Sequence, residues 1–223
     1  SSSGEYVKNP VDELTQLQLE NDEFSIILYD MDITSSGWSK DYMHKYMVIS
    51  TKDSLSDPPP SYTPWMDVRK TYFTENENNL SRELVSTQGG KVTKSVAPAG
   101  YGSYVGNSRY GEWKTNSSGQ SFWSFYGKYM FFSSVLALTT RPIYRNYYSD
   151  YRSNYYGRSS YYGPTVNGSK YYGTNSSYTK TSRPDFYQRR AQKSSSTRST
   201  RNSRSSSRYS SGSYRSRGGG FGK

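Results

Sequence analysis

Aliphatic side chains become very rare about two-thirds of the way along this chain. After Ile143, Val166 is the only Val, Ile, Leu or Met in the rest of the sequence. A segment with so few aliphatic residues lacks the apolar area for a packed core of the usual kind. We therefore expect a folded domain over residues 9–140, preceded by a polar tether at 1–8 and followed by a low-complexity tail at 141–223 that is disordered unless bound to a partner.

The formal net charge of +11 is divided at the same place. Residues 1–140 hold 12 Lys and Arg against 16 Asp and Glu, a net charge of −4, whereas residues 141–223 hold 17 against 2, a net charge of +15. A block of one sign usually meets a partner of the opposite sign. We expect the tail to engage an acidic protein or an anionic membrane or envelope surface, with nucleic acid as a further candidate. A solvated extension without a partner is the alternative.

The predicted fold class is α+β, with a small antiparallel sheet and one or two short helices. Asn9 can cap a helix that begins at Pro10, and acidic residues fill its first turn, which predicts a helix over 10–22. The runs 24–33 and 42–51 are rich in Ile, Met, Phe and Tyr and predict two strands. A turn at 34–41 would join them in a hairpin.

The remainder of the predicted domain is less regular. Prolines at 57–64 predict a loop, where Pro59-Pro60-Ser61-Tyr62 also matches a pattern read by small polyproline-binding domains. A strand is expected at 65–74, and residues 80–87 suit either a short helix or a strand. Aromatic residues at 110–114 and 121–132 predict further strands around a turn.

Residues suited to catalysis are scarce. His44 is the only histidine and there is no cysteine, so a typical zinc site or a thiolate nucleophile is excluded. Asp30 and Asp32 would share a face of a strand, where two carboxylates could contact one divalent cation, although a solvated strand end is the alternative. We therefore predict no catalytic, cofactor or metal residues and expect a protein that is not an enzyme.

The tail combines tyrosine with arginine. Tyr-Tyr-Gly recurs at 155–157, 161–163 and 171–173, and arginines follow at short intervals after residue 183. Arginine binds phosphates and carboxylates, while tyrosine rings stack on bases and cations. The predicted interaction residues of the tail are Tyr155, Tyr156, Tyr161, Tyr162, Tyr171, Tyr172, Arg189, Arg190, Arg198, Arg201, Arg204, Arg208, Arg215 and Arg217.

Three segments carry a resemblance to a known group of proteins. They are Tyr110-Gly111-Glu112-Trp113, the run Phe122-Trp123-Ser124-Phe125-Tyr126-Gly127, and the terminal Arg215-Ser216-Arg217-Gly218-Gly219-Gly220-Phe221-Gly222. Over about its last half, the chain resembles exported bacterial proteins of uncharacterised function, often lipoproteins, that end in Tyr/Ser/Arg/Gly-rich tails. The lipid-bearing cysteine of such proteins is absent from this sequence, and the resemblance implies no catalytic residue.

These observations lead to a functional expectation. The chain starts at Ser1 in a short polar run, which suggests either a processed N-terminus, with a lipid attached to a residue that this sequence lacks, or a tag remnant. We expect a non-enzymatic interaction or structural protein of the bacterial cell envelope whose basic tail engages an anionic surface or partner protein. The alternative is an intracellular protein that binds RNA or single-stranded nucleic acid through the tail.

Overall fold

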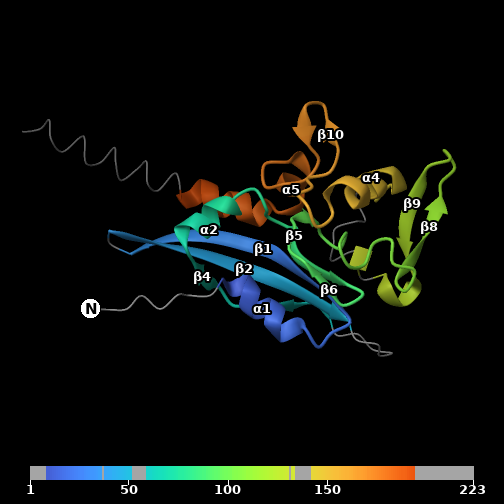
Figure 1. Ribbon diagram of the computed structural model, residues 1–223. Coiled ribbons are helices and arrows are strands. Elements are labelled where there is room, and N and C mark those ends of the chain that lie inside the picture. Colours follow the sequence, from blue (N-terminus) through green and yellow to red (C-terminus); the bar gives the residue numbers. More distant parts are fainter. Residues whose placement is uncertain (1–8, 37, 52–58, 131, 134–141, 194–223) are drawn as a thin grey trace, which may run out of the picture. The chain divides into compact units, whose positions relative to one another are not determined.

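The chain divides into two compact units, Ser1–Ser182 and Arg183–Lys223. Figure 1 shows the computed structural model, coloured along the sequence. It describes residues 9–36, 38–51, 59–130, 132–133 and 142–193.

The first unit is built on a seven-stranded sheet whose pairs are all antiparallel (Figure 1). The strands run in the order β3-β2-β1-β5-β6, with β4 paired to β2 and β7 paired to β5. Their bounds are β1 (Glu23–Ser36), β2 (Ser39–Thr51), β3 (Ser61–Tyr62), β4 (Met66–Val68), β5 (Arg82–Gln88), β6 (Lys91–Thr93) and β7 (Ala97–Pro98).

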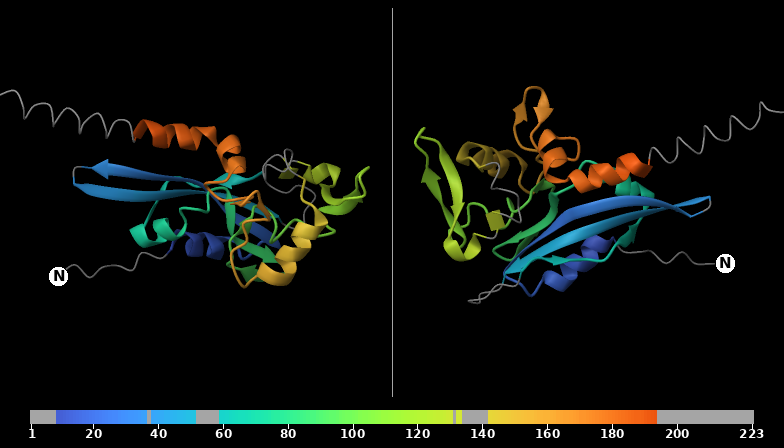
Figure 2. Two further views of the ribbon diagram at one scale, coloured as in Figure 1. Left: turned by 90° about the horizontal axis from the view of Figure 1, so that it is seen from above. Right: turned by 180° about the vertical axis from the view of Figure 1, so that it is seen from behind.

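The predicted hairpin is confirmed, and it is longer than expected. β1 and β2 pair continuously from Glu23 opposite Thr51 to Ser36 opposite Ser39, with one irregularity between Leu28 and Asp30. The predicted turn at 34–41 is therefore mostly strand. Because β5 pairs only with the first part of β1 and β4 pairs with β2 only as far as Tyr42, the end of the hairpin continues as a two-stranded ribbon (Figures 1 and 2).

Helix α1 (Pro10–Gln18) begins where the sequence predicts. Asn9 Oδ1 accepts the backbone N–H of Val11 at 3.0 Å, and Pro10 occupies the first helical position. Val11 and Thr15 are buried, and the helix packs on β1 and β5. The helix ends at Gln18 rather than at residue 22. Leu17, in its last turn, is 73% exposed, so the buried side of the helix does not extend to its C-terminal end.

Two predicted elements differ from the structure. Segment 65–74 forms β4 and then α2 (Lys70–Glu75), and the buried ring of Phe73 on this helix packs against His44, with ring centroids 5.2 Å apart. Residues 121–132 form β9 (Ser121–Phe125), paired with β8 (Gly111–Thr115), and then a 3-10 turn, η1 (Gly127–Tyr129). The ambiguous run at 80–87 is a strand, β5.

The domain does not end at residue 140. The first compact unit continues to Ser182, so the predicted start of the tail at 141 is wrong. This stretch contains a helical turn, a π-helical turn, two short strands and a last helical turn, which are α4 (Arg145–Asp150), η2 (Tyr151–Tyr155), β10 (Thr165–Val166), β11 (Ser169–Lys170) and α5 (Ser177–Ser182).

Tyrosine rings make this extension possible. Tyr148, Tyr151 and Tyr161 are buried in the same core as Ile27 and Met47 of the sheet. Their rings surround Tyr101, with centroid distances of 5.9, 5.5 and 6.4 Å. Each buried aromatic ring removes about 150–250 Å² from water, so a tyrosine-rich segment can form a core without aliphatic residues.

A buried carboxyl group fixes the loop that carries Tyr101. Glu83 on β5 is fully buried and accepts the backbone N–H groups of Gly100 at 3.0 Å and Gly102 at 2.9 Å. It also accepts the hydroxyl of Ser25 on β1. A Cβ atom at Gly102 would overlap Ser86 Oγ and lie 2.5 Å from Glu83 Oε1, so this position requires glycine.

The second unit is described over residues 183–193. A helix runs through 184–193, and Pro184 suits its first position. Arg183 Nε lies 3.5 Å from Asp185 Oδ1, and the guanidinium of Arg190 lies 5.4 Å from the Phe186 ring centroid. The predicted α+β class, with antiparallel sheets and short helices, is confirmed. Residues 194–223 of the predicted tail lie outside the described part.

We expect Tyr151→Phe to leave the free energy of unfolding unchanged or to raise it by about 1 kcal/mol, because the buried Tyr151 hydroxyl has no hydrogen-bond partner among the described residues. Tyr104→Phe is the matched control, since the Tyr104 hydroxyl donates to Ile49 O at 3.1 Å and its loss should cost about 1 kcal/mol. Chemical denaturation of the full chain measures both. Equal losses in the two variants would contradict this description of the core.

We also expect Glu83 to make stability depend on pH. Burial raises the pKa of Glu83 from 4.5 to about 7. Because the pKa of Glu83 is higher in the folded than in the unfolded state, its contribution to the free energy of unfolding is complete below pH 4.5 and is lost as the pH rises through 7. The stability advantage of the wild type over Glu83→Gln should therefore fall by about 3 kcal/mol between these pH values. An advantage that does not change with pH would contradict the burial of this carboxyl.

Candidate functional site

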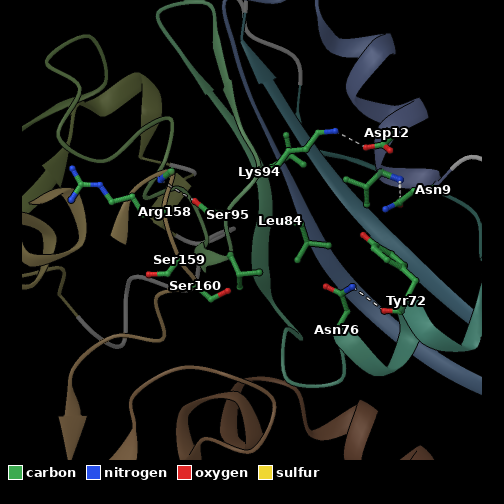
Figure 3. A pocket seen from close by; sticks show the side chains of 14 residues that line it. Asn9, Asp12, Tyr72, Asn76, Leu84, Lys94, Ser95, Arg158, Ser159 and Ser160 are labelled. Atoms are coloured by element: carbon green, nitrogen blue, oxygen red, sulfur yellow. Dashed lines mark hydrogen bonds and ion pairs between the residues drawn. The ribbon is translucent and has the colours of Figure 1, made fainter. Parts of the chain in front are cut away.

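A cavity of about 350 Å³ lies in the first unit beside the start of α1. It is lined by α1, by α2 and the residue after it, by β5, by the segment after β6, and by residues 157–160 that follow η2. Figure 3 shows Tyr72 and Asn76 on one side of the cavity and Ser159 and Ser160 on the other, with Leu84 between them. The cavity thus combines an apolar side chain with hydroxyl and amide groups.

The charged groups of this cavity are already paired. Lys94 Nζ lies 2.8 Å from Asp12 Oδ1, and these side chains are 58% and 48% exposed. The side chain of Arg158 points away from the cavity, and its Nη1 donates to Ser153 O at 3.1 Å (Figure 3). Asn76 donates its amide to the backbone of Tyr72 at 2.9 Å. The lining residues therefore offer hydrogen-bonding groups for a small polar molecule, but no nucleophile beside a general base.

His44 is a core residue in the structure. Its ring is fully buried between Tyr46, Tyr72 and Phe73, and Nδ1 lies 3.0 Å from the Tyr46 hydroxyl. Burial lowers the pKa of His44 from 6.5 to about 4, so the ring is neutral near pH 7. An enclosed, neutral imidazole has no access to a substrate.

Each of the two carboxylates of β1 accepts a backbone N–H group. Asp30 Oδ1 accepts the N–H of Met31 at 2.8 Å, and Asp32 Oδ1 accepts the N–H of Ile33 at 2.9 Å. This part of β1 lies beyond its pairing with β5, so these N–H groups are not bonded to that strand. The two aspartates therefore satisfy backbone donors of a long strand. Among the described residues, no group of three His, Cys, Asp or Glu side chains is placed to hold a metal ion.

Several tyrosines predicted to act in the tail lie inside the domain. Tyr161 and Tyr172 are 2% and 6% exposed, and the Tyr172 ring centroid lies 4.5 Å from the buried Arg82 guanidinium. Tyr155 and Tyr156 are partly buried against the core. These rings stabilise the fold, so the interpretation of Tyr161 and Tyr172 as accessible binding residues is wrong.

The remaining predicted residues differ in their surroundings. Tyr162 donates its hydroxyl to Asn79 Oδ1 at 2.7 Å, and Tyr171 lies 5.1 Å from Tyr172, measured between ring centroids. Arg189 and Arg190 belong to the helix of the second unit. Outside the described residues lie Arg198, Arg201, Arg204, Arg208, Arg215 and Arg217.

The structural boundary sharpens the division of charge. Arg183–Lys223 holds 11 Lys and Arg against one Asp, a net charge of +10. Ser1–Ser182 holds 18 against 17, a net charge of +1. Almost the entire excess of positive charge therefore belongs to the second unit, and the first unit is close to neutral.

One exposed residue escaped the sequence analysis. Trp38, at the end of the β1–β2 ribbon, has 106% of the reference exposure, the largest value among the exposed hydrophobic residues described. The sequence signal was a tryptophan beside Gly37 within the predicted turn. Because its side chain is fully exposed, Trp38 does not stabilise the fold by packing.

We expect His44 to oppose Glu83 in the pH dependence of stability. Because the pKa of His44 is lower in the folded than in the unfolded state, its contribution to the free energy of unfolding is complete above pH 6.5 and is lost as the pH falls through 4. His44→Asn removes this loss, which is about 3 kcal/mol in the wild type. Denaturation of both proteins between these pH values measures it. Parallel pH profiles for the variant and the wild type would contradict the burial of a neutral imidazole.

Within the described part of the chain, no helix is long and apolar enough to cross a membrane. Comparison of the sequence with protein-family models, with curated proteins and with solved structures finds no match.

Proposed function

We propose that this chain is a non-enzymatic interaction protein of the bacterial cell envelope, in which residues 183–223 engage an anionic surface. The observation that carries the proposal is the coincidence of the charge boundary with the end of the compact unit. A net charge of +10 follows a nearly neutral unit that ends at Ser182. Basic segments beside an anionic lipid surface gain about 1 kcal/mol for each Lys or Arg.

The first unit serves as a scaffold in this proposal. Many of its tyrosines and its only histidine are engaged in packing, and its two strand carboxylates accept backbone N–H groups of β1. Such a unit supplies stability and position, while the second unit supplies the charge for binding. The cavity beside α1 offers room for a small polar molecule and does not conflict with this role.

The alternative is a protein that binds single-stranded nucleic acid. Such binding usually combines arginines with aromatic rings on which bases stack. Burial of Tyr161 and Tyr172 removes two of the rings that favoured this function, and Tyr187, Tyr209 and Tyr214 are the tyrosines left in the second unit. The arginines alone favour an anionic surface over base stacking.

We expect replacement of Arg198, Arg201, Arg204 and Arg208 by Gln in the full chain to weaken binding to anionic vesicles by about a hundredfold or more. The probe is phosphatidylcholine vesicles with a minority of phosphatidylglycerol, and co-sedimentation measures the bound fraction. Replacement of the same four residues by Lys is the matched control, because it keeps the charge and should keep most of the binding.

Two results would contradict the proposal. One is equal binding by the wild type and the Gln variant at low ionic strength, where exposed charges act most strongly. The other is tight binding of single-stranded oligonucleotides without any binding of the vesicles, which would favour the nucleic-acid alternative.

A further inference from the structure

The end of the β1–β2 ribbon has an unusual composition for an exposed hairpin. Four cross-strand pairs complete it, from Ile33 opposite Tyr42 to Ser36 opposite Ser39. Among the described strands, only β4 joins the ribbon here, at Tyr42–His44, and it does not reach the tip. Figures 1 and 2 show the ribbon extending beyond the other strands of the sheet.

The tip carries one large amphipathic ring on small polar neighbours. Trp38 is fully exposed, and Ile33, on the same ribbon, is 36% exposed. Residues 33–41 contain one Lys and one Asp, so the tip has no net charge. Residues 34–39 at its end carry no charged side chain, so this end can leave water without the cost of desolvating a charge.

We propose that the ribbon tip inserts Trp38 into the interfacial region of a lipid bilayer. Tryptophan concentrates at this depth because its ring is apolar and its N–H needs a polar partner. The projecting tip carries a single large ring, and this shape suits a deformable surface such as a lipid bilayer. This inference rests on the proposed function and deepens it by naming the anionic surface as a lipid bilayer.

The spacing of charges along the ribbon agrees with shallow insertion. Lys40 lies two residues from Trp38, a separation of about 7 Å along a strand. With the Trp38 ring below the head groups, the Lys40 ammonium would lie at the level of the lipid phosphates, where lysine interacts favourably. Asp41 is one residue further from the tip, on the aqueous side.

Insertion of the tip and attraction of the basic segment would act together. A single hydrophobic or electrostatic signal gives weak, reversible membrane binding, whereas two signals give stable attachment. The two contributions differ in their response to salt, because screening weakens exposed charges and leaves apolar burial intact. This difference allows them to be measured separately.

The experiment compares the full chain with Trp38→Ala and Trp65→Ala on vesicles of phosphatidylcholine and phosphatidylglycerol. Trp65 is the matched control, because it is also exposed, at 40%, but lies outside the ribbon. We expect Trp38→Ala to bind about tenfold more weakly, also in about 1 M salt, where the Debye length is about 3 Å. Trp65→Ala should bind like the wild type.

A second measurement reports on depth. Lipids brominated on the acyl chain should quench tryptophan fluorescence of the wild type and of Trp65→Phe, and quench Trp38→Phe much less. Unchanged binding of Trp38→Ala together with unchanged quenching of Trp38→Phe would overturn the proposal.

The outcomes also separate this inference from the proposed function. If the arginine-to-glutamine variant binds like the wild type while Trp38→Ala binds weakly, the basic segment is not involved and the tip is. If the reverse holds, the proposed function stands and the tip proposal fails. Because Trp38 is fully exposed, its replacement should leave the melting temperature unchanged, which excludes unfolding as the cause of weaker binding.

Discussion

The carboxyl group of Glu83 holds together the parts on which the compact unit depends. It lies on the central part of the sheet and binds Ser25 of the neighbouring strand and the backbone of Gly100 and Gly102. The loop fixed in this way carries Tyr101, around which the tyrosines of the C-terminal extension pack. An aliphatic residue at 83 would leave two backbone donors buried without acceptors, and each would cost about 1–3 kcal/mol.

Tyrosine replaces aliphatic residues in the core over about the last fifth of the compact unit, after Ile143. A buried hydroxyl usually has a hydrogen-bond partner, although among the described residues that of Tyr151 has none. Several find one in the backbone or in a polar side chain, as Tyr104 does at Ile49 O and Tyr162 at Asn79 Oδ1. The result is a unit whose surface charge is nearly balanced and whose aromatic residues are mostly committed to packing. The excess positive charge is left to Arg183–Lys223.

Sequence patterns predicted the elements that local chemistry determines. The capping residues before Pro10 located the start of α1, and the apolar runs on either side of 34–41 located the hairpin. Sequence patterns failed to predict the features that depend on contacts between residues far apart in the chain. Nothing local indicates that Glu83 would meet Gly100 and Gly102, and the tail boundary at 141 was too early because tyrosine was not counted as a core residue. Asp30 and Asp32 were correctly placed on a strand, but their bonds to the following N–H groups could not be read from spacing.

Hydrogen exchange of the full chain, with and without vesicles containing phosphatidylglycerol, tests the central claim most directly. The claim is that a tyrosine-built unit extends to Ser182 and positions separate binding elements. It predicts strong protection of the amides between 144 and 182 in both conditions, with slower exchange on vesicles confined to 183–223 and to the ribbon tip near Trp38. Exchange at unprotected rates from 144 onward, or vesicle-induced protection confined to 144–182, would contradict it.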